Sequence, residues 1–245
     1  MLFVSQISYA SYSVTHLNTT VTLNLNNSAS VREILTINIS NVSISQYAND
    51  RADLNLTLSN WQALIGPLLS QHIINPKNGV YNFKFLPGPP KLSITGQEQA
   101  QLLMSYDVMN VTTVTQSAPR TFIYSFTPNV LNFEHGASGV VLNPNTTLTI
   151  ILPSGSKIST IFPTPDIPSG AFASDYANVT QVSWLYQEPL SKFTLVFVIK
   201  QSIPAEVEAF FKAVYTKLGI FTYIVIGAII VLFMLYTYFK SVESG

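Results

Sequence analysis

The chain has 245 residues, no cysteine and only 10% charged residues, and its twelve basic side chains balance twelve acidic ones. The lack of cysteine excludes disulfides, thiol nucleophiles and iron–sulfur clusters, and the isolated basic residues give no support to nucleic-acid binding. Neutral Asn, Ser, Thr and Gln must solubilise the surface. Because these groups do not titrate, we expect an acid-tolerant fold, although an ordinary neutral-pH ectodomain fits the same composition.

The N-terminal residues MLFVSQISYASYS are apolar but lack a basic segment. Ser8-Tyr9-Ala10 resembles a small-residue cleavage site. Either the initiator lies upstream, or residues 1–10 are the remnant of a short export segment.

Two amphipathic strands are predicted next, because apolar and polar residues alternate with a period of two. In the first, Val21, Leu23 and Leu25 share one face. The second runs from Val31 to Ser43, with its apolar residues on one side and its polar residues on the other. Asn26 and Asn38 are therefore expected to face water.

A helical insertion follows these strands. Ser59-Asn60-Trp61-Gln62 has the spacing of a capping box, and an apolar helical stripe continues as far as Ile73. Pro67 lies inside that stripe and predicts a kink or two short helices. The residues Asn75-Pro76-Lys77-Asn78-Gly79 predict a turn, and the stiff corner Pro87–Pro90 follows a strand over 80–86.

The remaining ectodomain reads as short strands separated by Pro, Gly and Asn clusters, at 91–95, 100–115, 120–126, 147–152, 157–162, 181–186 and 193–200. This pattern is typical of a mainly β protein, a β-sandwich with one short helical insertion. It spans residues 11–200, either as one large sandwich or as two small packed ones divided near 87–96. Trp184 is expected in its core.

The C-terminal region predicts two consecutive helices. Residues 201–217 carry Glu206 and Glu208 early and Lys212 and Lys217 late, an order that complements a helix dipole. We interpret them as a juxtamembrane helix, with a short coiled-coil stalk as the alternative. The uncharged run LGIFTYIVIGAIIVLFMLYTYF, residues 218–239, would form a helix of ~33 Å, enough for a hydrocarbon core of about 30 Å.

The run 218–239 is predicted to be a transmembrane helix rather than a buried core helix, and aromatic residues at both of its ends favour this reading. Residues 240–245 would form a short cytoplasmic tail. The bilayer is then an expected partner, and the bulk of the chain is expected outside the cytoplasm, at the cell membrane.

The predicted orientation rests on Asn-Xaa-Ser/Thr triplets, which accept N-linked glycans in segments that cross the membrane. The chain contains eight, about twice the number that random placement would give, and they begin at Asn18, Asn26, Asn38, Asn41, Asn55, Asn110, Asn145 and Asn178. A β-rich chain that draws its polarity from Asn, Ser and Thr could also produce such triplets by composition alone.

Catalytic, cofactor-binding and metal-binding motifs are lacking in the sequence. The histidines His16, His72 and His135 have no metal-ligand spacing. Glu134-His135-Gly136 and nearby Ser138 read as a solvated loop, and Ser138 lacks the final glycine of a nucleophile elbow. Asp166, Asp175 and Glu188 are carboxylates that would have to converge to form a glycan-cleaving pair.

One further segment, Ile161–Pro168, holds three prolines among apolar residues. It predicts either a rigid crossover between sheets or a loop that docks a partner.

The low charge, absent cysteine, repeated acceptor triplets and single C-terminal span resemble envelope proteins of thermoacidophilic archaea of the Sulfolobus type. The runs LTIILPSGSKISTIFPTPD and VSWLYQEPLSKFTLVFVI, within roughly residues 146–199, are also similar to single-pass archaeal proteins with ribophorin-like sandwiches. Ribophorin is an accessory subunit of oligosaccharyltransferase, so this resemblance implies a non-catalytic partner of a membrane enzyme. It assigns no role to any individual residue.

Three functions fit these features. The first is an anchored, glycosylated, non-catalytic ectodomain, either an accessory subunit of a membrane complex or a cell-envelope component, with an integral-membrane or envelope protein as its partner. The second is a glycan-acting enzyme with convergent carboxylates. The third is an ectodomain that binds a solute or a glycan.

Overall fold

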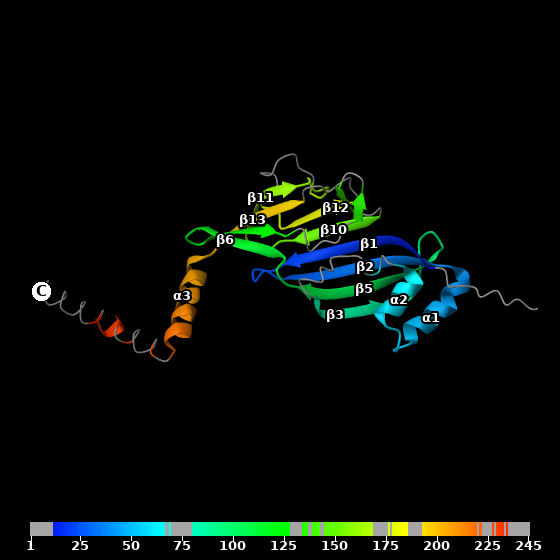
Figure 1. The fold of residues 1–245 in the computed structure, drawn as a ribbon, viewed down its shortest axis with the longest axis horizontal. Helices are drawn as coiled ribbons and strands as arrows, with labels where there is room; N and C mark the ends of the chain where they lie inside the picture. The colour runs from blue at the N-terminus through cyan, green and yellow to red at the C-terminus, as the bar shows by residue number, and fades with distance from the viewer. Residues whose placement is uncertain are drawn as a thin grey trace, which may run out of the picture. The chain divides into compact units, whose positions relative to one another are not determined.

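The computed structural model shows a mainly β chain whose strands form two large sheets (Figure 1). It describes residues 12–66, 69, 80–127, 134–136, 139–142, 145–168, 176, 178–185, 193–219, 221, 227, 229–232 and 234. The chain divides into two units, Met1–Ser117 with Phe122–Ile199, and Ala118–Thr121 with Lys200–Gly245. Each unit is described by itself.

The larger sheet contains the longest strands of the chain. Its order is β12 (Gln181–Leu185), β10 (Thr146–Ile151), β1 (Tyr12–Leu23), β2 (Ala29–Ile39), β5 (Glu98–Val108) and β3 (Val80–Pro87), with β4 (Lys91–Leu92) also paired to β5. The β1–β10 pair is parallel, and the other pairs of this sheet are antiparallel.

The smaller sheet has the order β11 (Ser156–Phe162), β13 (Thr194–Lys200), β7 (Thr121–Phe126) and β6 (Thr112–Ala118). A separate two-stranded sheet joins β8 (Glu134–Gly136) to β9 (Gly139–Val141). The prediction of a loop at Glu134–Gly136 was therefore wrong. The glycines that suggested a loop lie at the closed end of this pair, where Gly136 is opposite Gly139.

One end of the larger sheet packs against the smaller sheet, which gives the fold its β-sandwich core. Residues of β1, β2, β5, β10 and β12 meet residues of β7, β11 and β13 in a single apolar cluster. Trp184 lies fully buried there, and its ring meets Phe193 edge-on with centroids 5.0 Å apart. Tyr124 of β7 stacks on Phe197 of β13.

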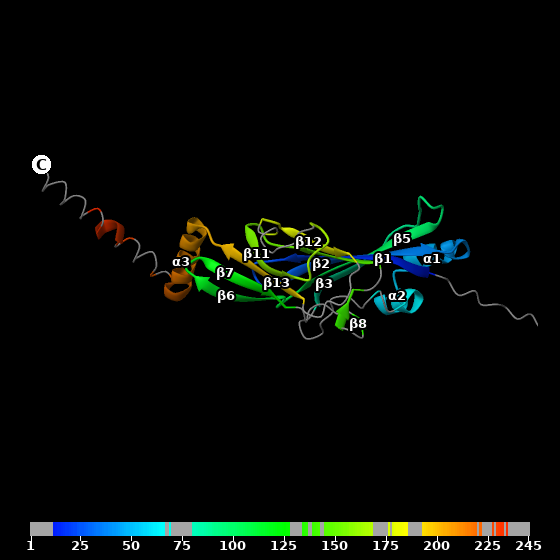
Figure 2. The same ribbon diagram turned by 90° about the horizontal axis from the view of Figure 1, so that it is seen from above.

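The other end of the same sheet face is covered by helices α1 (Ile44–Ala52) and α2 (Leu58–Ile65), which lie together at one end of the long strands (Figures 1 and 2). A chain of edge-on aromatic contacts links Tyr12, Tyr47, Trp61 and Phe85, with centroids 5.7–5.8 Å apart. Tyr12 also donates a hydrogen bond to Asp50 of α1. Strands β1, β2 and β5 thus contribute side chains to two adjoining cores.

The helical insertion differs from its prediction in three ways. Residues 40–43 leave β2 as a turn of 3₁₀-helix, η1 (Asn41–Ser43), which leads into α1, a helix that the sequence analysis missed. The capping box of α2 joins Thr57 to Asn60 rather than Ser59 to Gln62. The helix ends at Gly66, whose φ of 106° suits glycine. Most of the predicted continuation to Ile73, with Pro67, lies outside the described residues.

The predicted strands over 80–86, 120–126, 147–152, 157–162, 181–186 and 193–200 are confirmed to within one residue at each end. The first predicted strand was wrong in its position, because β1 begins at Tyr12 and ends at Leu23, so that Leu25 lies beyond it and is 57% exposed. The predicted strand over 100–115 was wrong, because it is two strands separated by Met109–Val111, where Asn110 has φ of 59°. The predicted second strand ended at Ser43, but β2 stops at Ile39. The first break lies at Asn110, a polar residue in a turn conformation, and β2 ends where Ser40 leads into η1.

The proline-rich segment after β11 covers an edge of the larger sheet. Asp166 and Ile167 donate backbone hydrogen bonds to Ser183 O, and Ser183 N donates to Ile167 O at 2.8 Å. The Asp166 carboxylate accepts from Leu185 N at 2.7 Å, and Trp184 Nε1 donates to Pro163 O at 3.0 Å. The segment is therefore the crossover between sheets, and it occupies backbone groups that an edge strand would otherwise expose.

In the second unit, helix α3 (Ile203–Leu218) matches the helix predicted over 201–217. Just before α3, two hydrogen bonds join Arg120 and Gln201. Gln201 N donates to Arg120 O, and Arg120 Nε donates to Gln201 O. The predicted span 218–239 lies mostly outside the described residues. Among the residues that are described, no helix combines the length and the apolar character needed to cross a membrane.

Candidate functional site

The eight acceptor asparagines occupy two kinds of position. Asn18 lies within β1 and Asn38 within β2, both half-buried on the face of the larger sheet that points away from the cores. The other acceptors are exposed at turns, helix ends and loops: Asn26, Asn41, Asn55, Asn110, Asn145 and Asn178. An exposed turn leaves room for a bulky sugar, whereas a strand in mid-sheet crowds it.

Asn26 is exposed and is hydrogen-bonded within its own triplet. It lies in the β1–β2 turn, where Asn27 has φ of 64°. Its side-chain oxygen accepts hydrogen bonds from the backbone N–H and the hydroxyl of Ser28, the third residue of the triplet, at 3.3 and 2.6 Å. These bonds engage the oxygen of the Asn26 amide and not its nitrogen, the atom that a glycan would join.

Asn38 and Asn18 are more constrained. Asn38 donates to Gln97 and accepts from Gln99, at 3.0 and 2.9 Å. The side-chain oxygen of Asn18 is buried and has no partner among the described residues. The expectation that Asn38 faces water therefore holds only for part of its surface.

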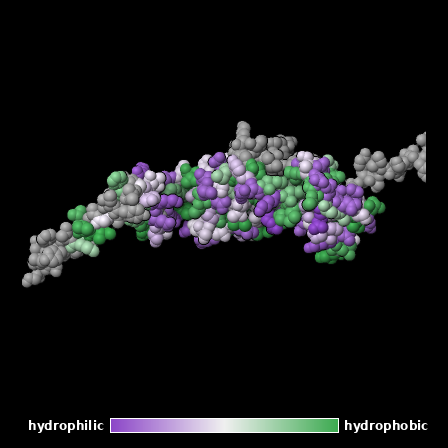
Figure 3. Space-filling view, turned by 90° about the horizontal axis from the view of Figure 1, so that it is seen from below, coloured by the Kyte–Doolittle hydropathy of each residue, from purple (hydrophilic) through white to green (hydrophobic). Residues whose placement is uncertain are grey.

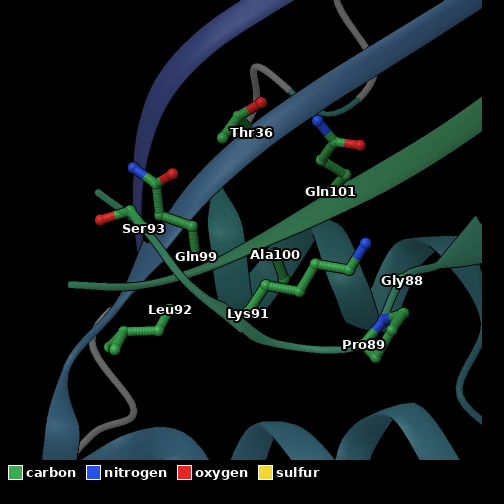
Figure 4. Close-up of a pocket in the computed structure, with 9 residues that line it drawn as sticks. All are labelled: Thr36, Gly88, Pro89, Lys91, Leu92, Ser93, Gln99, Ala100 and Gln101. Carbon is green, nitrogen blue, oxygen red and sulfur yellow. The ribbon is translucent and has the colours of Figure 1, made fainter. Parts of the chain in front are cut away.

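A hollow of about 210 Å³ lies where the Pro87–Pro90 corner crosses the larger sheet (Figure 4). Gly88 N donates to Gln101 O at 2.7 Å, and a side chain at Gly88 would place its Cβ the same distance from that oxygen. Helix α1 holds the corner, because Tyr47 and Arg51 donate to the carbonyl oxygens of Gly88 and Pro87. Only glycine permits this close approach.

The lining of this hollow is neutral apart from one ammonium group. In Figure 4, Gln99, Ala100 and Gln101 come from β5, Lys91 and Leu92 from β4, and Thr36 from β2. Amide, hydroxyl and ammonium groups of this kind suit hydrogen bonding to a polar ligand or to a partner's backbone. Gln99 also holds Asn38, so the hollow adjoins one of the acceptor triplets.

One carboxyl group is buried in the apolar interior: Glu33 is 1% exposed on the inward face of β2. Its two neighbours on that face belong to different cores. Val31 belongs to the sandwich cluster and Leu35 to the helix-covered cluster. Glu33 lies opposite Thr19 of β1, which is also buried, and accepts a hydrogen bond from the Tyr106 hydroxyl at 2.5 Å.

Burial raises the pKa of the Glu33 carboxyl to about 8, against a smaller lowering effect of the hydrogen bond from Tyr106. Burial and the adjacent carboxyl also raise the pKa of the Tyr106 hydroxyl. Glu33 is therefore protonated over the acidic range, and the two cores meet at an uncharged carboxylic acid. The sequence contained a signal for this site, because position 33 is in phase with the inward residues Val31, Leu35 and Ile37.

The described residues add no geometric support for the catalytic alternatives. Asp166 binds the edge of β12, while Asp175, Glu188, His72 and Ser138 lie outside the described residues. His16 is placed beside Thr147, 3.3 Å from its hydroxyl, on the outer sheet face. Within the described part of the chain, no three His, Asp or Glu residues come together as a metal site would require.

In comparisons with known proteins, no family model matches the chain, and no curated protein is significantly similar to it.

Proposed function

We propose that this chain is a membrane-anchored, glycosylated ectodomain that works by protein contact, without catalysis, as an accessory subunit of a membrane complex or as a component of the cell envelope. The sandwich would lie outside the cytoplasm, and residues 218–239 would cross the bilayer.

One observation supports the proposed membrane anchor. Ile229, Ile230, Val231 and Leu232 are consecutive helical residues, and each is 50–65% exposed. Four consecutive residues point to nearly every side of a helix, so packing on one face cannot cover them. Hydrocarbon surrounds a helix on all sides and removes this cost. Phe221 and Met234 are exposed in the same way, and the C-terminal segment is green where it is not grey in Figure 3.

The helix before the predicted span supports a role in lateral contact. Ile203, Val207, Phe210, Phe211 and Tyr215 of α3 are all about half exposed or more. Exposed apolar area of this kind is favourable only against lipid or another protein. A partner in or on the same bilayer would meet α3 close to the membrane surface.

The proposal can be tested by fractionation and mild-detergent pull-down of the full chain from its native source. We expect the chain in the alkaline-washed membrane pellet, and a stoichiometric integral-membrane or envelope protein in the pull-down. A matched variant truncated after Lys217 should leave the membrane, because it lacks the apolar run. Recovery of the full chain in the soluble fraction would refute the anchor, and recovery of a lone chain would refute the accessory role.

Glycosylation gives a separate test of the side on which the sandwich lies. We expect the intact mass of the native protein to exceed 27.0 kDa and site mapping to find sugar on Asn26. Asn26→Gln should remove that glycan, while Asn49→Gln, which changes an exposed asparagine outside any triplet, should leave it in place. Bare asparagines at all eight acceptors would contradict an extracytoplasmic sandwich in a glycosylating host.

A further inference from the structure

Helix α3 carries large apolar side chains along one side. Its apolar stripe consists of Ile203, Val207, Phe210, Phe211 and Val214, whose spacing of three and four residues places them on one surface of the helix. The first four are 46–61% exposed, and Val214 is half-buried. The rings of Phe210 and Phe211 meet edge-on, with centroids 5.7 Å apart. Packing within the chain therefore leaves most of the apolar stripe uncovered.

The opposite side of α3 is polar. Glu208, Lys212 and Thr216 lie four residues apart and form one row along the helix, and all three are exposed. The sequence of α3 holds two glutamates and two lysines, so the helix has no net charge. A helix with one apolar and one polar side suits the boundary between hydrocarbon and water, and without net charge its contact depends on apolar area.

A helix break separates α3 from the residues that follow it. Gly219 has φ of 56°, and its backbone N–H donates to Tyr215 O at 2.7 Å. A residue in this left-handed conformation closes the last turn of a right-handed helix and redirects the chain. Gly219 lies between α3 and the exposed helical residues 229–232, so α3 and these residues do not form one straight rod.

The proposed anchor begins where α3 ends. If residues 218–239 cross the bilayer, Gly219 lies at the membrane surface together with the last turn of α3. A helix redirected there can run along that surface, over a length of about 24 Å for its 16 residues. Its apolar stripe then meets hydrocarbon below the headgroups, while Glu208 and Lys212 stay in water. A stalk standing in water would instead keep the stripe exposed, at a cost in free energy.

We infer that α3 lies in the plane of the membrane as an interfacial helix, with its apolar stripe covered by lipid of the bilayer that residues 218–239 cross. The inference rests on the proposed anchor. It goes beyond the anchor by assigning lipid, and not a protein partner, as the surface that covers the stripe. A protein partner would then meet α3 on the polar row of Glu208, Lys212 and Thr216.

Site-directed spin labelling tests this position, and the chain has no native cysteine to remove first. The full chain carries one nitroxide-labelled cysteine at a time, in phosphatidylcholine nanodiscs. Val207→Cys and Phe210→Cys probe the apolar stripe, and Lys212→Cys and Thr216→Cys are the matched controls on the opposite side. All four positions are exposed, so we expect the fold to tolerate the labels. Collisions with oxygen, which concentrates in lipid, are compared with collisions with a nickel chelate, which stays in water.

We expect the ratio of oxygen to nickel accessibility to be several-fold higher at the two stripe positions than at the two controls. Water-like ratios at all four positions would overturn the inference in favour of a stalk. Lipid-like ratios at all four would overturn it in favour of a helix immersed in the bilayer. Protection of the stripe from both reagents would overturn it in favour of contact with a second copy of the chain.

A fifth label, Val231→Cys, separates failure of this inference from failure of the proposed anchor. We expect a lipid-like ratio at Val231, which is 56% exposed in the apolar run. If Val231 is lipid-like and the apolar stripe is not, the anchor stands and only the interfacial position of α3 is wrong. A water-like ratio at Val231 would refute the anchor and this inference with it.

Discussion

Replacing Glu33 with Gln should stabilise the folded chain at pH 8 and above and change its stability little below about pH 4.5. Gln has nearly the same shape and can still accept the hydrogen bond from Tyr106, but it carries no charge. The rise of the Glu33 pKa from 4.5 to about 8 corresponds to on the order of 5 kcal/mol at high pH. That gain is large beside the total stability of a typical domain.

The direction of the effect follows from proton binding. Between pH 4.5 and about 8 the folded chain holds a proton on Glu33 that the unfolded chain has released. Stability therefore falls as the pH rises through this interval, and the full cost of the buried carboxylate is present above it. Below pH 4.5 the group is protonated in both states and costs nothing.

Denaturant unfolding of the full chain in a nonionic detergent, at pH 4, 6 and 8, would measure this difference. Glu98→Gln, a half-buried carboxyl at the start of β5, is the matched control and should not change the pH profile in this way. Parallel curves for the Glu33→Gln variant and the unmodified chain would show that Glu33 is not the titrating group.

The acid tolerance expected from the neutral composition has a structural counterpart in Glu33, because both favour the folded state at low pH. Asp107 acts in the opposite direction. Hydrogen bonds from Asn82 and Ser30 lower its pKa in the folded chain, so its contribution is present above pH 3.8 and is lost as the pH falls through its folded value. Asp107 is only partly buried, and we expect its influence to be the weaker of the two.

Trp184→Ala should destabilise the fold by about 3–5 kcal/mol, the usual cost of removing a fully buried aromatic ring. The change opens a cavity beside Phe193 and leaves Pro163 O without its indole donor. Trp184→Phe is the matched control: it keeps a ring but loses the hydrogen bond, and should cost about 1–3 kcal/mol.

Unfolding of both Trp184 variants by denaturant, followed by circular dichroism, would check this order. Because β1, β2 and β5 run through both cores, we also expect the helix-covered core to unfold in the same transition. A cost below about 1 kcal/mol for Trp184→Ala would mean that the crossover and the sandwich core pack differently from this description.

Local patterns predicted the strands well, since each depends mainly on its own residues. Alternation of apolar and polar side chains marked β2 and β13, and an uninterrupted run between turn residues marked β7 and β10. Helix α3 was visible from the charge order along its length. The helix α1 was missed, because ISQYANDRA has a weak apolar stripe and is held by Tyr47, Asp50 and their distant partners.

Residue type and short-range periodicity were enough to predict the mainly β character of this chain, the core position of Trp184 and the acceptor triplets. Tertiary structure alone decided that two cores share one sheet face, that Glu33 lies at their junction, and that Asn82 and Asp107 meet at a bulge between β3 and β5. Strand register and the covering of a sheet face arise from contacts between residues distant in sequence. A period-two pattern can place Glu33 on the inward face, but only the packed neighbours make that face dry enough to hold its proton.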